Sequence, residues 1–198
     1  MNNMIFVREY PEPQINYKEV CCYYGNASPN NEEKALLDIC LKEAEGAFTY
    51  KICFSLFPIH IERKDVDFGF IRLNSANLAR NLSGCDKAVV FSATVGVEID
   101  RLIARYSKIS PAKALCFQAI GSERIEALCN AFCNDLKNEY GAVKPRFSPG
   151  YGDLSLECQK EIFRVLDCER KIGLTLIDSL LMMPSKSVSA FVGIRKGE

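Results

Sequence analysis

The sequence contains few of the residues and motifs on which common catalytic centres depend. Its 198 residues include one histidine, His60, which disfavours histidine-based triads and multi-histidine metal sites. There is no glycine-rich dinucleotide loop, no P-loop and no Gly-x-Ser-x-Gly sequence. His60 follows Pro58 in an apolar stretch, where a structural role is favoured over a catalytic one. The acid pairs Asp65/Asp67 and Glu98/Asp100 have the spacing of solvated side chains, so we assign no catalytic residue.

The chain also has no formal net charge and no long apolar run. Lys and Arg number 25, as do Asp and Glu, which argues against a strongly basic nucleic-acid binder. Residues 1–13 contain Arg8, Glu9 and Glu12 and lack the apolar centre of a signal peptide. The longest uncharged apolar run, residues 88–97, is too short to cross a membrane. We therefore expect a soluble cytoplasmic protein without nucleic-acid or membrane partners.

The ten cysteines include no Cys-x-x-Cys pair. Cys129 and Cys133 are four residues apart on one face of an expected helix, and Cys21 and Cys22 are adjacent. Zinc and iron–sulfur sites usually show tighter ligand pairs, so we expect no metal site. Free cysteine behaves as a small buried hydrophobe, and this usage fits a reducing compartment.

Periodicity and capping residues predict a mixed fold. Helices are expected at 16–24, 32–45, 74–81, 97–106 and 111–138, with one more between Ser155 and Gly173. The long helix should bury one face, made up of Leu115, Ile120, Ile125, Leu128, Phe132 and Leu136. Strands are expected at 49–57, 66–72 and 87–93, and extended runs at 174–183 and 187–194 with a hairpin-like connection at 183–186.

Strands and helices do not alternate regularly along the chain. This order favours an α+β fold, in which a twisted antiparallel sheet is flanked by helices. No linker or internal repeat divides the sequence, so we expect one domain over residues 1–198. Residues 1–90 carry no motif that indicates a role.

One short stretch, Arg146 to Tyr151, combines a tight turn with groups that bind ligands. Pro149 fixes one φ angle, and Gly150 can adopt the positive φ of a type II turn. Arg146 offers a planar fork that suits a carboxylate or a phosphate. Tyr151 offers a ring for stacking and a hydroxyl. The stretch is therefore a candidate ligand site, although most Pro-Gly turns are only turns.

Combined with the sequence that follows, this stretch resembles a known family. Arg146-x-x-x-Gly150-Tyr151 is followed by an expected helix, by Gly173-Leu-Thr175 and by a proline and Ser187-Val-Ser189 near the end. This pattern is similar to the activation domain of vitamin B12-dependent methionine synthase, in which Arg-x-x-x-Gly-Tyr binds S-adenosylmethionine. The detailed resemblance covers residues 139–194, and the earlier part resembles the family only in its order of elements.

The resemblance implies a set of site residues and partners. Arg146 would bind the methionine carboxylate, the Ser148 backbone would meet the adenine, Gly150 would allow close approach and Tyr151 would line the site. Glu139 is the nearest match to an acid that the family carries before the arginine, one residue out of register. The cofactors implied are S-adenosylmethionine and a cobalamin, whose cob(II)alamin form is reduced by a flavodoxin- or ferredoxin-like donor and then methylated.

The chain lacks other parts of the complete enzyme. The cobalamin motif Asp-x-His-x-x-Gly and the zinc–cysteine homocysteine site are both missing. We therefore expect an activation-domain protein that belongs to a methyltransferase system and serves a separate, cobalamin-carrying methionine synthase. Reactivation of another corrinoid methyltransferase, or a non-catalytic S-adenosylmethionine-binding module, is the alternative. Two further family residues, an early acid and a late tyrosine, have no counterpart that we can place.

Overall fold

The fold is arranged around a four-stranded antiparallel sheet. In the computed structural model, which describes residues 4–195, the strand order is β1 (Phe6–Tyr10), β2 (Tyr50–Pro58), β6 (Cys85–Thr94) and β9 (Ser187–Arg195). Every neighbouring pair is antiparallel, with Phe54 opposite Phe91 and Ala190 opposite Phe91. The predicted α+β class with a central antiparallel sheet is confirmed. β6 is an inner strand, between β2 and β9.

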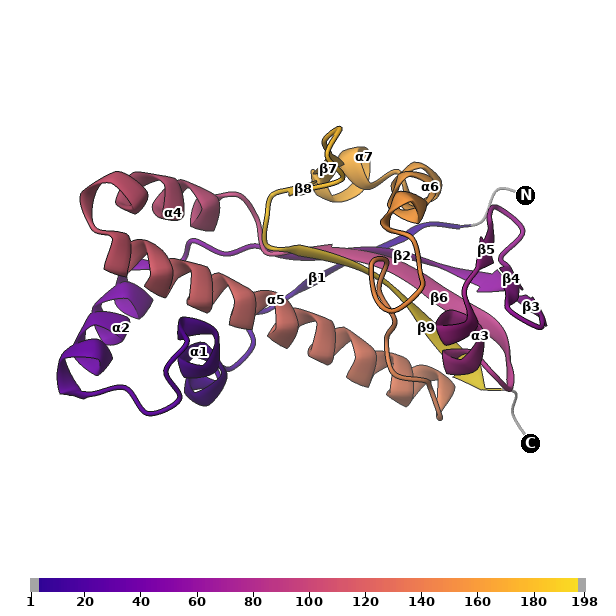
Figure 1. Cartoon of the computed structure of the whole chain (residues 1–198), viewed down its shortest axis with the longest axis horizontal. Coiled ribbons are helices and arrows are strands. Elements are labelled where there is room, and N and C mark those ends of the chain that lie inside the picture. The colour runs from indigo at the N-terminus through magenta and orange to yellow at the C-terminus, as the bar shows by residue number, and fades with distance from the viewer. Residues whose placement is uncertain (1–3, 196–198) are drawn as a thin grey trace.

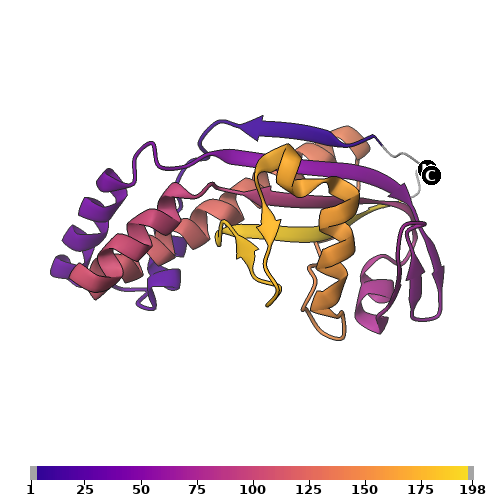
Figure 2. The same cartoon turned by 90° about the horizontal axis from the view of Figure 1, so that it is seen from above.

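Helices cover both faces of this sheet. The 30-residue α5 (Pro111–Tyr140) runs along one face, and α1 (Tyr17–Tyr24), α2 (Asn31–Glu43) and α4 (Glu98–Ile109) gather around its first half, beyond one end of the sheet (Figure 1). The short helices α6 (Gln159–Leu166) and α7 (Cys168–Ile172) lie across the other face (Figure 2).

Alternate residues of β6 point to opposite faces of the sheet and pack into different buried clusters. Val89 and Phe91 belong to the buried cluster that includes α5, and Ala88 and Val90 to the cluster that includes α6 and α7.

Most predicted helices are confirmed with their caps. The Asn16 side chain accepts a hydrogen bond from the Glu19 amide at the start of α1. At the start of α2, Asn30 and Glu33 form a capping box in which each side chain accepts from the other residue's backbone amide. Leu115 is the exception within α5, because its side chain is 46% exposed while the other predicted apolar positions are buried.

The predicted strand 66–72 is wrong. It divides into β4 (Asp65–Asp67) and β5 (Arg72–Asn74), which form a small sheet with β3 (His60–Glu62) beside α3 (Ala76–Asn81). The chain reverses at Gly69, whose φ is +80°, and the Phe68 amide donates to the Ile71 carbonyl at 3.0 Å. Phe68 and Ile71 pack in the second cluster, so the apolar alternation came from a turn whose apolar side chains are buried or partly buried.

The C-terminal hairpin prediction is also wrong. Residues 174–183 fold back on themselves as β7 (Thr175–Leu176) and β8 (Met182–Met183), while β9 pairs with β6 in the main sheet. The predicted helix after Ser155 begins with the 3-10 turn η1 (Leu156–Cys158) and is then split into α6 and α7, because Asp167 between them adopts a left-handed φ of +51°. β1 is an element that the sequence pattern did not indicate.

Nearly all the cysteines serve as small apolar residues. Eight of the ten are buried, Cys133 is half-buried and Cys22 is exposed. Within residues 4–195 no group of three His, Cys, Asp or Glu side chains could hold a metal ion. Over the same residues, no helix has the length and apolar character that a membrane span requires.

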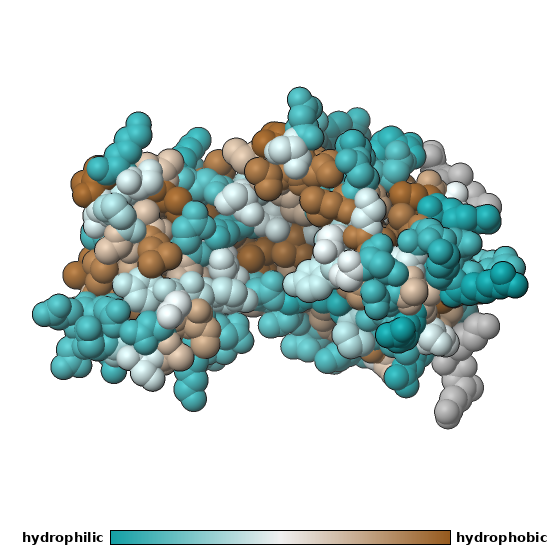
Figure 3. Space-filling model, in the orientation of Figure 1, coloured by the Kyte–Doolittle hydropathy of each residue, from teal (hydrophilic) through white to brown (hydrophobic). Residues whose placement is uncertain are grey.

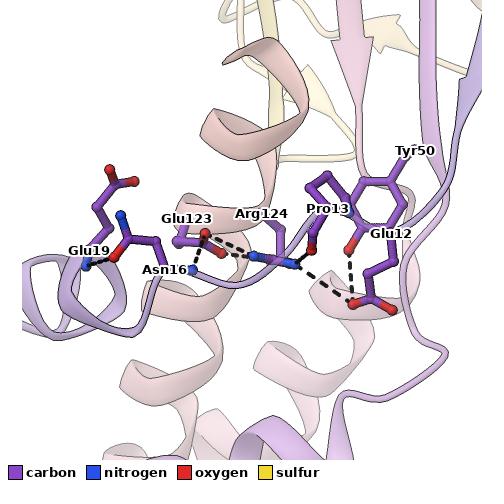
Figure 4. Close-up of polar contacts among 7 residues, drawn as sticks. All are labelled: Glu12, Pro13, Asn16, Glu19, Tyr50, Glu123 and Arg124. Atoms are coloured by element: carbon purple, nitrogen blue, oxygen red, sulfur yellow. Dashed lines mark hydrogen bonds and ion pairs between the residues drawn. The ribbon is translucent and has the colours of Figure 1, made fainter. Parts of the chain in front are cut away.

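A buried ion pair fixes the chain after β1 to the long helix (Figure 4). Glu123 and Arg124 are 1% and 2% exposed, and Arg124 Nε lies 2.5 Å from Glu123 Oε2. Arg124 Nη1 donates to the Pro13 carbonyl at 2.6 Å, and the Asn16 amide donates to Glu123 Oε1 at 3.0 Å. Both charges are therefore satisfied only when residues 13–16 lie against α5.

We predict that Glu123→Ala lowers the free energy of unfolding by about 3–5 kcal/mol, because it leaves the Arg124 guanidinium buried without its counter-charge. Urea denaturation measures this difference. The matched control is Glu98→Ala, which removes an exposed i,i+3 partner of Arg101 and should change stability by less than about 1 kcal/mol. Equal effects of the two substitutions would contradict this interpretation of the buried pair.

Candidate functional site

The stretch Arg146–Tyr151 forms the turn that its sequence predicts. The Tyr151 amide donates to the Ser148 carbonyl at 3.2 Å, and Gly150 has a φ of +86°, as the third residue of a type II turn requires. A Cβ at Gly150 would lie 3.3 Å from Leu156 Cδ1 and would add to the strain of the positive φ. Glycine is thus needed here for backbone conformation.

Two sets of contacts hold this turn in place. On its N-terminal side, Phe147 and Phe191 exchange two backbone hydrogen bonds of 2.9 Å, so the turn is attached to the outer edge of β9. On its C-terminal side, the Asp153 carboxylate accepts hydrogen bonds from the Ser75 hydroxyl and from the amides of Ala76, at 2.8 Å, and Asn77, at 3.2 Å. Asp153 therefore joins the turn to the start of α3.

A cavity of about 350 Å³ opens beside the turn, which is within the size range of small-molecule sites. It lies where α5, the turn, α6 and the edge of β9 meet. Its lining consists of Glu126, Arg146, Phe147, Ser148, Pro149, Tyr151, Gln159, Met182, Ser187, Val188 and Ser189. The cavity thus combines one ion pair with neutral polar and apolar side chains.

Arg146 carries the only guanidinium among the residues that line this cavity, and it faces α5. Its Nη2 forms a short ion pair with Glu126 Oε2, and its Nη1 donates to Asn130 Oδ1 at 3.2 Å. Burial lowers the pKa of Arg146, but the nearby Cys129 thiol and Glu126 carboxylate raise it above its ordinary value overall. The group is a permanent cation.

Apolar side chains surround the mouth of the cavity. Tyr151 is 68% exposed, and Leu181 and Met183, beside the Met182 of the cavity wall, are also exposed. Figure 3 shows apolar surface around the β7–β8 region, in the middle of the face seen there. Exposed apolar side chains therefore lie at, or next in sequence to, the residues that line the cavity.

The structure brings together most of the residues that the sequence singled out. Arg146, Ser148 and Tyr151 line the cavity, and Gly150 shapes the turn beside it. Glu139 does not line it: its carboxylate lies 2.5 Å from Arg8 Nη2, near the end of α5. The acid that lies against Arg146 is instead Glu126, which is on the same helix but well before Glu139.

Sequence reasoning missed Glu126 and Gln159. Glu126 and Asn130 are four residues apart on α5, so both project from the same face beside the buried stripe. The sequence signal that could have indicated Glu126 was this pair of polar residues at helical spacing, next to Leu128 and Cys129. Gln159 stands at the start of α6 between buried apolar positions, where no motif marks it.

Comparisons with known proteins agree with this fold. The family model for the vitamin B12 dependent methionine synthase activation domain matches residues 124–196, which include Arg146, Gly150 and Tyr151. No curated protein matches the chain in sequence. Among solved structures, the chain is similar to one described as the MetH reactivation domain bound to AdoHcy, with a TM-score of 0.74 and 15% sequence identity. That similarity covers 100% of this chain and 80% of the other.

The chain therefore has the fold of an activation domain, in which an antiparallel sheet carries a ligand-sized cavity at its edge. Its C-terminal part, residues 124–196, matches the family model for the activation domain of vitamin B12 dependent methionine synthase, the family that the sequence resembles.

The carboxylate that holds the turn predicts a pH effect. The pKa of Asp153 is lowered to about 2, mainly by the Ser75 hydroxyl and then by the amides of Ala76 and Asn77. A folded-state pKa below the unfolded value stabilises the fold above the unfolded pKa, and this contribution disappears as pH falls through the folded pKa. The stability difference between wild type and Asp153→Asn should thus be constant above about pH 5 and vanish near pH 2.

Urea denaturation of both proteins across this pH range measures the difference. Asp178→Asn, at an exposed aspartate, is the control and should track the wild type at every pH. A difference that persists unchanged at pH 2 would show that the Asp153 charge does not support the turn.

Proposed function

We propose that the chain binds S-adenosylmethionine in the cavity beside the Arg146–Tyr151 turn and takes part in reactivating a cobalamin-dependent methionine synthase. The cobalamin would be carried by a partner protein, and residues 1–198 would act as one activation-domain-like unit. The observation that carries this proposal is the ion pair of Arg146 with Glu126 on the wall of a ligand-sized cavity, within the segment that the family model matches.

The ion pair suits the amino-acid end of the ligand. S-Adenosylmethionine carries a carboxylate and an ammonium group on the same carbon atom. The Arg146 guanidinium can bind the carboxylate through two parallel hydrogen bonds, and the Glu126 carboxylate can accept from the ammonium group. Because Arg146 and Glu126 already face each other, a zwitterion inserted between them keeps each charge compensated.

The turn suits the rest of the ligand. The Ser148 backbone lines the cavity in the tight turn that the positive φ of Gly150 allows, and it can meet a flat nucleobase there. Tyr151, at the mouth, would lie beside the part of the ligand that faces a docked partner. Glu139 has no ligand contact in this proposal, since its carboxylate pairs with Arg8 outside the cavity.

The contribution of these residues to methyl transfer would be chiefly positioning. Fixing the carboxylate at Arg146 and the nucleoside at the turn leaves the sulfonium methyl group as the part free to face the partner, which lowers the entropic barrier of the reaction. The cobalamin of the partner supplies the methyl acceptor, and a flavodoxin- or ferredoxin-like protein supplies the electron. No general acid or base is required of the chain.

Calorimetric titration tests the binding site. We predict that Arg146→Ala weakens S-adenosylmethionine binding roughly 30- to 150-fold, the effect of losing a charged hydrogen-bonded contact. Arg72→Ala, which removes an exposed partner of Asp67 far along the chain, is the matched control and should bind as the wild type does. Decarboxylated S-adenosylmethionine should bind the wild type and Arg146→Ala about equally.

An Arg146→Ala variant that binds S-adenosylmethionine as tightly as the wild type would contradict the assignment of Arg146. Absence of wild-type binding, both alone and with a cobalamin-loaded synthase present, would contradict the proposed function as a whole.

Reactivation itself can be followed with methyl-labelled S-adenosylmethionine. We predict that the chain, mixed with a methionine synthase in the cob(II)alamin state and a reductant, transfers label to the synthase-bound cobalamin, and that Arg146→Ala does so much more slowly at limiting ligand. The absorbance of cobalamin and the label provide independent readouts. Ligand binding without transfer to any corrinoid protein would indicate a docking or sensing module instead.

A further inference from the structure

We infer that Gln159 and the open edge of β9 at Ser189 form the second half of the ligand site, where they bind the nucleoside part of S-adenosylmethionine. This inference rests on the proposed function and adds residues that neither the turn nor the family motif assigns a role. Four observations support it: the position of the charges, the open strand edge, and two buried polar side chains without partners.

The first observation is that charge is confined to one side of the cavity. Glu126 and Arg146 lie on the side of α5, which covers one face of the sheet. Gln159 begins α6, which packs on the opposite face. Ser189 is on β9 between them. The cavity therefore runs across the sheet edge from an ion pair to neutral polar groups, which suits a ligand with a zwitterionic end and an uncharged nucleoside end.

The second observation is that β9 is only partly covered on its outer side. The Phe147 and Lys144 amides donate to the carbonyls of Phe191 and Gly193 at 2.9 and 2.8 Å. In a strand, alternate residues direct their backbone groups to the same side, so the Ser189 amide and carbonyl point outward as those of Phe191 do. Within residues 4–195 neither group bonds to another segment on that side.

An open strand edge of this kind can form hydrogen bonds with the edge of a purine. One residue offers a backbone donor and a backbone acceptor in one plane, which match the ring nitrogen and the exocyclic amine of adenine. In most proteins such an edge is covered by another strand or loop. Here the covering segment, residues 142–147, leaves the edge at the turn, and the cavity begins at the next residues of β9.

The third and fourth observations concern the side chains of Gln159 and Ser189. They are 5% and 1% exposed, and Gln159 Oε1 and Ser189 Oγ have no hydrogen-bond partner in the described part of the chain. A buried polar atom without a partner is destabilising. Two other such atoms, Ser92 Oγ and Asn81 Oδ1, belong to residues that do not line the cavity.

A nucleoside in the cavity would provide the missing partners. Rotation of the Gln159 amide directs either its oxygen or its nitrogen to the cavity, so it can accept from an amine or hydroxyl and donate to a ring nitrogen. The Ser189 hydroxyl can do both. Ligand binding would therefore satisfy groups that the folded chain leaves unsatisfied, in addition to the contacts at Arg146.

The test is calorimetric titration with two probes, S-adenosylmethionine and 5′-deoxy-5′-methylthioadenosine, which keeps the nucleoside and lacks the amino-acid end. We expect Gln159→Leu to weaken binding of both probes roughly 10-fold and Ser189→Ala to weaken both about 3- to 10-fold, as expected for neutral hydrogen bonds. Arg146→Ala should weaken S-adenosylmethionine alone.

Two matched controls accompany these variants. Gln118→Leu changes an exposed glutamine of α5, and Ser92→Ala changes the buried serine directly opposite Ser189 on β6. Both should bind the two probes as the wild type does. Thermal melts identify any variant that fails to fold, and Ser189→Ala, which deletes one unpartnered oxygen, keeps the test valid if Gln159→Leu does not fold.

The outcomes separate this inference from the proposed function. If the wild type binds S-adenosylmethionine, and Gln159→Leu and Ser189→Ala bind it with the same affinity, the inference is overturned and the proposed function stands. Loss of S-adenosylmethionine affinity without loss of methylthioadenosine affinity also overturns it, because the two residues would then act at the amino-acid end. If the wild type binds neither probe, with or without a cobalamin-loaded synthase, the proposed function itself is overturned, and the inference that rests on it falls as well.

Discussion

Two backbone hydrogen bonds between Phe147 and Phe191 bring the separate parts of the candidate site together. They attach the chain that leaves α5 to the outer edge of β9 and place the Arg146–Tyr151 turn directly beyond the attachment. Without this pairing, Arg146 and the Ser187–Ser189 edge would have no fixed relation, although both belong to the C-terminal third of the sequence. The pairing also ends at the turn, which is why the strand edge is open where the cavity begins.

The remaining contacts make this arrangement rigid from both sides of the sheet. Asp153 joins the end of the turn to α3, and the Arg146–Glu126 pair joins its beginning to α5. α5 is in turn fixed along its length by the cluster that contains Phe132 and by the buried Glu123–Arg124 pair. A ligand would therefore meet a turn and a strand edge that are already in place, which reduces the ordering cost of binding, and only the Arg146–Glu126 pair would have to open to admit its amino-acid end. Tyr151, Leu181 and Met183, by contrast, are exposed at the surface.

The sequence predicts much of this fold because local signals and tertiary packing agree there. The caps at Asn16 and Asn30, the Ser110-Pro111 helix start and the type II turn at Gly150 are each determined by a few neighbouring residues. Where the local signals and the tertiary packing disagree, the predictions are wrong. Phe68–Ile71 alternates like a strand because apolar side chains on both sides of a tight turn pack into the second cluster. Residues 174–183 form their own two-stranded hairpin because β9 takes its partner from β6, which lies far earlier in the sequence.

The residues of the candidate site were likewise predictable only where they are close together in the sequence. Arg146, Ser148, Gly150 and Tyr151 are close in sequence, so a short motif can identify them. Glu126 and Gln159 reach the cavity only through the crossing of α5 and α6 over opposite faces of the sheet, which no local pattern encodes. The acid expected near Arg146 was for this reason placed at Glu139, whereas the long helix carries that residue to Arg8 on β1, the opposite edge strand of the sheet.

The most direct test of the central claim is a crystal structure of the protein with S-adenosylhomocysteine, the product that remains after methyl transfer. The account predicts that the ligand carboxylate lies within hydrogen-bonding distance of the Arg146 guanidinium and that its nucleoside lies against Ser148 and the β9 edge. A ligand bound elsewhere, or bound in the cavity with its amino-acid end turned away from Arg146, would contradict the account.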